Sequence, residues 1–90
     1  MSTQVAPPTA EAVKAGLTAF LEARTKRPVA ADLDLFASGL VSSLFAMELL
    51  VHIEGSFQLT IPSAELRLDS FRTIDAMTSL VLRLAGAARG

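Results

Sequence analysis

Two adjacent serines, Ser42 and Ser43, are the residues of this sequence best placed to take part in covalent chemistry. They follow Gly39 closely and come directly before a strongly apolar run, LFAMELLV. One serine is enough to cap a helix by accepting a hydrogen bond from a free backbone N–H, which stabilises the helix by about 1 kcal/mol relative to alanine. If Ser42 is this cap, Ser43 lies in the first turn with its hydroxyl close to solvent.

A hydrolytic role for Ser43 is disfavoured because no base accompanies it. The sequence has no G-x-S-x-G motif, and its one histidine, His52, lies on the same predicted helix. The separation between Ser43 and His52 corresponds to about 13 Å along the axis and about half a turn around it. We therefore give His52 no role beyond a surface or boundary position. Ser43 remains a possible substrate for another enzyme, and the start of a helix favours a phosphate there.

The hydrophobic pattern predicts helices at about 9–25, at 43–57 and from 71–73 to about 84. Thr9 is the expected N-cap of the first helix, and Pro28 prevents its continuation. The connection up to Ser42 is expected to be a loop packed on the core, and the segment after Pro62 to form one or two short turns. No segment of useful length alternates like a strand.

The expected fold class is therefore all-α, a small four-helix bundle with three main helices, one short helix and a long first loop. We expect residues 1–8 to be a disordered tail, residues 9–85 to be the domain, and residues 86–90 to be a frayed C-terminus.

The helix predicted at 43–57 has two apolar stripes. The stripe assigned to the core comprises Ala46, Leu49, Leu50 and Ile53. The second stripe, flanked by Glu48 and Glu54, comprises Leu44, Met47 and Val51. Two explanations remain open from periodicity alone: the first loop, with Leu35 and Phe36, covers the second stripe, or the stripe is a docking surface for a partner.

Composition excludes several classes of function. The net charge of −1 argues against nucleic acid as a partner, and the absence of cysteine removes disulfides and zinc-finger spacings. Arg24, Lys26 and Arg27 are explained as cations near a helix C-terminus. No stretch is long enough to span a membrane, and the start lacks a signal peptide, so we expect a cytoplasmic protein. Met1 and a length of one domain suggest a free-standing chain.

Three segments resemble the acyl carrier protein family, which is closely similar to peptidyl carrier domains. DLDLFASGLVSSLFAMELLVHIEGSF resembles the attachment motif of that family, in which Asp-Ser-Leu opens an apolar and acidic helix. LTIPSAEL resembles the Ile-Pro step after this helix, and DSFRTIDAMTSLV resembles the last helix, which starts at a threonine. The resemblance extends over about residues 9–84.

The resemblance implies a non-enzymatic carrier with a 4′-phosphopantetheine arm on Ser43, the serine before the leucine. A phosphopantetheinyl transferase would supply the arm from coenzyme A, and an acyl-activating ligase or acyltransferase would charge its thiol with acyl or aminoacyl groups as thioesters. Downstream synthases or modifying enzymes would then receive the cargo from a monomeric carrier. The family's partner-binding positions match Leu44, Met47, Glu48 and Val51, and its core positions match Leu49, Ile53 and Phe57.

Two departures suggest a specialised carrier. Ser42 stands where the family usually has aspartate, which removes a negative charge but keeps a helix cap. Phe45 and His52 occupy positions where fatty-acid carriers commonly have acidic or small residues, and a net charge of −1 is weak for that group. We therefore expect a carrier of secondary metabolism, such as polyketide or nonribosomal peptide biosynthesis, or of an aminoacyl-loading system. The alternative is an unmodified helical adaptor that binds a partner helix through Leu44, Met47 and Val51.

Overall fold

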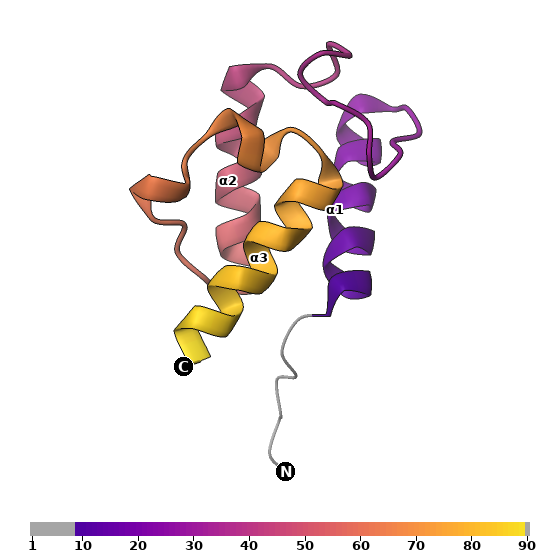
Figure 1. The fold of residues 1–90 in the computed structure, drawn as a ribbon. Coiled ribbons are helices and arrows are strands. Elements are labelled where there is room, and N and C mark those ends of the chain that lie inside the picture. The colour runs from indigo at the N-terminus through magenta and orange to yellow at the C-terminus, as the bar shows by residue number, and fades with distance from the viewer. Residues whose placement is uncertain (1–8, 90) are drawn as a thin grey trace.

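Three α-helices and two short 3-10 turns form the computed structural model, which describes residues 9–89, with side chains up to residue 86. The elements are α1 (Ala10–Thr25), α2 (Ser43–Phe57), η1 (Ser63–Glu65), η2 (Leu68–Phe71) and α3 (Ile74–Arg89). In Figure 1, α1 and α2 run in opposite directions, and α3 lies obliquely across them. No strand occurs between residues 9 and 89, so the all-α, carrier-like class predicted from the sequence is confirmed.

Local capping sets the bounds of α1 and α2. The side chains of Thr9 and Ser42 accept hydrogen bonds from backbone N–H groups three residues ahead, each at 3.1 Å. Both helices end at residues in the left-handed region, Lys26 with φ 59° and Gln58 with φ 53°. The backbone N–H of each of these residues donates to the carbonyl four positions earlier, which satisfies a free acceptor at the helix end. These bounds agree with those predicted from the sequence.

One hydrophobic core joins all three helices. α2 contributes Ala46, Leu49 and Ile53, whereas Leu50 is half-buried. The other helices contribute Val13, Leu17, Leu21, Ile74, Met77, Leu80 and Val81. Phe57 packs against the edge of this cluster. The core stripe predicted for α2 is therefore confirmed.

The long connection from α1 to α2 is packed onto the body of the protein. Leu35 is fully buried, and its backbone N–H donates to the Arg72 carbonyl at 2.7 Å. The Asp75 N–H at the start of α3 donates to the Ala31 carbonyl at 3.0 Å. This loop does not cover the second stripe of α2, because Leu44, Met47 and Val51 are all exposed. The explanation in which the loop covers the stripe is therefore wrong.

The last helix continues further than the sequence suggested. α3 is helical to Arg89, past the end expected near residue 84, and the run of alanines explains this because alanine has the highest helix propensity. Fraying of residues 86–90 stays a prediction. The disordered tail predicted for residues 1–8 lies outside the described residues.

Candidate functional site

Ser43 begins α2 with its side chain exposed to solvent. Its neighbour Ser42 is the N-cap and accepts a hydrogen bond from the Phe45 N–H. The N–H groups of Ser43 and Leu44 belong to the first turn of the helix, where no preceding turn supplies an acceptor. A hydroxyl at this point is accessible, and an anion attached to it would be favoured by the positive end of the helix dipole.

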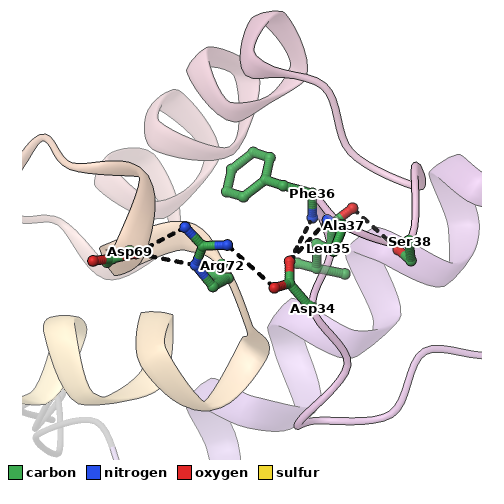
Figure 2. Close-up of polar contacts among 7 residues, drawn as sticks. All are labelled: Asp34, Leu35, Phe36, Ala37, Ser38, Asp69 and Arg72. Carbon is green, nitrogen blue, oxygen red and sulfur yellow. Dashed lines mark hydrogen bonds and ion pairs between the residues drawn. The ribbon is translucent and has the colours of Figure 1, made fainter.

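A compact turn leads the chain into this helix (Figure 2). Asp34 Oδ1 accepts hydrogen bonds from the backbone N–H groups of Phe36 and Ala37, at 3.1 and 2.9 Å. The Ser38 hydroxyl donates to the Leu35 carbonyl at 3.1 Å. Gly39 has φ 82°, a left-handed conformation that favours glycine. These contacts fix the direction in which the loop reaches Ser42.

Arg72 anchors this turn to the junction of η2 and α3 (Figure 2). Its guanidinium lies 3.2 Å from Asp34 Oδ2 and 2.9 Å from Asp69 Oδ1. The pKa of Asp34 is lowered, mainly by the Ala37 N–H and further by the hydrogen bond from Arg72. The two carboxylates raise the pKa of Arg72. The start of α2 is thereby tied to the η2–α3 junction.

Three apolar side chains on α2 form an exposed surface that begins next to Ser43, which we call the α2 patch: Leu44, Met47 and Val51, at 78%, 59% and 66% exposed. Its existence agrees with the second stripe seen in the sequence. Leu66 and Leu68 are also about half exposed and were not predicted to be so. Their exposure could have been inferred from the segment ELRLD, in which leucine alternates with charged residues. This alternation does not fit the spacing of a buried helical stripe.

An apolar pocket lies beside Ser43, between α2 and the 3-10 turns. Its volume is about 260 Å³. Its walls include Ser43, Met47, Leu50, Leu66, Arg67 and Phe71. Leu66 and Leu68 therefore continue the apolar surface of α2, and Ser43 lies at the edge of this surface.

A second pocket, larger and more polar, lies on the side of Ser42. Its volume is about 540 Å³. Its walls include Arg24, Arg27, Ser38, Gly39, Ser42 and Phe45, which come from the end of α1, the loop and the start of α2. The start of α2 thus separates an apolar pocket from a cationic one.

Glu48, which the sequence placed among the partner-binding residues, is engaged within the protein. Its Oε1 lies 2.6 Å from a guanidinium nitrogen of Arg24. The Arg24 guanidinium also lies 4.9 Å from the centre of the Phe45 ring, a cation–π distance. Arg24 lies in the last turn of α1, which agrees with its explanation as a cation near a helix C-terminus. Its contacts with Glu48 and Phe45 were not predicted from the sequence.

His52 is a boundary residue, as expected from the sequence. Its ring stacks on Phe20 with 3.8 Å between the ring centres. Burial lowers its pKa. Within residues 9–89 it belongs to no group of ligands that could hold a metal. Its distance of about 13 Å along α2 from Ser43 prevents His52 from acting as a base for that serine.

Comparison with known proteins identifies the class to which this fold and site belong. Residues 12–81 match the family described as "Phosphopantetheine attachment site". The chain therefore belongs to this family of carrier proteins, whose prosthetic group is a covalently attached 4′-phosphopantetheine.

Named relatives are carriers as well. The chain is 32% identical over 50 residues to the D-alanyl carrier protein of Lactococcus lactis subsp. cremoris (strain MG1363), a match covering 56% of this chain and 63% of that protein. It is 34% identical over 56 residues to the D-alanyl carrier protein of Streptococcus suis (strain 05ZYH33), covering 62% of this chain and 71% of the relative. In the described part of the chain, none of the helices is long and apolar enough to cross a membrane.

Proposed function

We propose that Ser43 is the attachment residue of the 4′-phosphopantetheine arm and that the chain presents acyl or aminoacyl groups to partner enzymes as thioesters. One observation supports this assignment above all: Ser42 makes the capping hydrogen bond, which leaves the exposed hydroxyl of Ser43 free to react. The residues around Ser43 fit a phosphopantetheine arm, because the first turn of α2 favours its phosphate and a pocket lies open on each side of this turn.

The attachment is a transfer that needs a separate enzyme. The Ser43 hydroxyl attacks the phosphorus of coenzyme A that bears pantetheine, forming a phosphodiester and breaking the pyrophosphate bond. Adenosine 3′,5′-bisphosphate leaves, and the hydroxyl proton passes to a base of the transferase, because the described residues that line the pocket beside Ser43 include no histidine or carboxylate. The chain itself performs no catalysis in this scheme.

The cargo is an acyl or aminoacyl group bound to the thiol of the arm. A ligase or acyltransferase loads it, and downstream enzymes receive it. The names of the two relatives make D-alanine one candidate cargo. Intermediates of polyketide or nonribosomal peptide biosynthesis are the other candidates, because Ser42, Phe45 and His52 depart from the pattern of fatty-acid carriers.

Partner enzymes are proposed to dock on the α2 patch, with Glu48 at its edge. A small exposed apolar surface suits repeated and short-lived contacts better than a permanent interface. Substituting Met47→Glu is expected to slow turnover by the loading enzyme. The matched control is Ala19→Glu, which introduces the same charge on α1 at another exposed position. Equal turnover of the two variants would contradict docking on the α2 patch.

The absence of cysteine gives a direct assay for the arm. The full chain is incubated with coenzyme A and a broad-specificity phosphopantetheinyl transferase, freed of small molecules and titrated for thiols. The proposal predicts one thiol per chain for the wild type and none for Ser43→Ala. An adaptor that is never modified would show no thiol in either protein while a control carrier gains one.

A further inference from the structure

We propose that the surface around Ser43 is cationic and that it recognises a partner protein by carboxylate side chains surrounding an apolar contact. This inference rests on the proposed function, because it concerns the enzymes that approach the arm.

The carboxylates of α2 are already engaged within the protein. Glu48 lies 2.6 Å from Arg24, which balances its charge. Glu54 Oε2 accepts a hydrogen bond of 2.8 Å from the Ile61 N–H after the end of the helix. α2 has no other acidic residue, and Ser42 adds no charge at its start. The patch therefore offers little negative charge to a partner.

Two arginines, by contrast, stand on opposite sides of the start of α2. Arg27 lines the polar pocket with Ser42, and Arg67 lines the apolar pocket with Ser43. Both side chains are exposed, and neither forms an ion pair with any residue between 9 and 86. The Nε of Arg67 donates to the Ala64 carbonyl at 3.3 Å. Glu65 and Asp69 line a neighbouring pocket with Arg67, but their carboxylates are paired with Arg83 and Arg72.

The phosphodiester of the arm on Ser43 would offset the positive end of the α2 dipole, so Arg27 and Arg67 carry the positive charge of this surface. The net charge of the whole chain is only −1, so the cationic character is local to this face rather than a general attraction for polyanions. Charge complementarity then requires acidic side chains on the partner, arranged around a hydrophobic contact with Leu44 and Met47. A basic partner surface would meet Arg27 and Arg67 at short range.

The test uses two amphipathic helical peptides with the same leucine face, one flanked by glutamates and the other by lysines. Each peptide is titrated into the isotope-labelled full chain, and the amide shifts of Arg27, Leu44 and Met47 give the affinity. We expect the glutamate peptide to bind more tightly, by about two- to fivefold for each exposed charge pair. The preference should decrease as salt is added.

Two charge-reversal variants test whether the preference depends on the charge of Arg27. Arg27→Glu is expected to reduce the preference for the glutamate peptide. The control Lys14→Glu, which reverses a charge on α1 away from Ser43 and also breaks the Lys14–Asp75 ion pair, is expected to leave the preference unchanged. Circular dichroism verifies that both variants are folded. Equal affinity for the two peptides, tighter binding of the lysine peptide, or equal effects of the two variants would overturn the proposal.

Two further measurements test whether a membrane or a second copy of the chain binds this surface instead of an acidic protein. Vesicles of phosphatidylglycerol that bind the chain when the glutamate peptide does not would point to a membrane, and self-association without peptide would point to a second copy. Either result would overturn recognition of an acidic protein. Modification of Ser43 is measured independently, so a modified chain without preference for the glutamate peptide would refute this inference and leave the proposed function intact.

Discussion

Arg72 Nη1 lies 3.2 Å from Asp34 Oδ2, which joins the turn before α2 to the junction of η2 and α3. Asp34 also accepts the backbone hydrogen bonds that shape this turn, while Arg72 holds Asp69 on its other side. The turn that leads to Ser43 is therefore held by an ion pair between segments that are distant in the sequence. This is the structural reason to expect that Asp34 affects the site without touching it.

Replacing Asp34 with asparagine should lower stability and loosen the start of α2. Because the folded-state pKa of Asp34 is lowered from 3.8, the stability it contributes is fully present above that ordinary pKa and is lost as pH falls through the folded-state value. The unfolding free energies of wild type and Asp34→Asn should therefore converge below about pH 4. A constant difference at all pH values would show that the ionisation of Asp34 plays no part.

His52 should make stability depend on pH in a higher range. Its pKa is lowered from 6.5 by burial, so the unfolded chain takes up the proton first as pH falls. Stability is fully present above about pH 6.5 and decreases as pH falls towards the folded-state pKa. Melting temperatures at pH 7.5 and pH 5.5 measure this decrease. It should be reduced in His52→Phe, which retains an aromatic ring against Phe20; an unchanged decrease would assign it to other groups.

The two stripes of α2 should respond differently to truncation. Leu49 is fully buried, so Leu49→Ala is expected to cost about 2–5 kcal/mol of unfolding free energy through lost burial and a cavity. Leu44 is mostly exposed, so Leu44→Ala should change stability by less than about 0.5 kcal/mol. Chemical denaturation measures both values. Similar costs for the two variants would mean that the α2 patch is covered in solution.

Ser42 should matter for stability and not for attachment. Ser42→Ala removes the cap on the Phe45 N–H and is expected to cost about 0.5–2 kcal/mol. Ser43→Ala removes no hydrogen bond of the cap and should be nearly neutral. Denaturation of the two variants checks this order. A larger loss of unfolding free energy for Ser43→Ala than for Ser42→Ala would show that Ser42 is not the helix cap.

Local sequence signals predicted the helices well because the caps are local. Thr9 and Ser42 identify helix starts by their own side chains, and the spacing of apolar residues distinguishes Leu49, on the core side of α2, from Met47, on the exposed side. The far end of α3 was placed too early, because the alanines after Leu84 have no hydrophobic stripe to reveal the helix.

Contacts between distant residues could not be predicted from the same signals. Asp34 with Arg72, Arg24 with Glu48, and Phe20 with His52 are brought together only by the fold. No periodicity encodes which charge meets which, so the ion pair of Glu48 with Arg24 could not be predicted when Glu48 was assigned to partner binding. The cationic pocket beside Ser42 was missed for the same reason, since its walls come from three separate segments.

Intact mass is the most direct measurement of whether Ser43 bears the arm. Wild type, Ser43→Ala and Ser42→Ala are incubated with coenzyme A and a phosphopantetheinyl transferase that modifies a control carrier. We predict that wild type and Ser42→Ala each gain the mass of one phosphopantetheinyl group and that Ser43→Ala gains none. A gain in Ser43→Ala, or loss of the gain in Ser42→Ala alone, would contradict the assignment of Ser43.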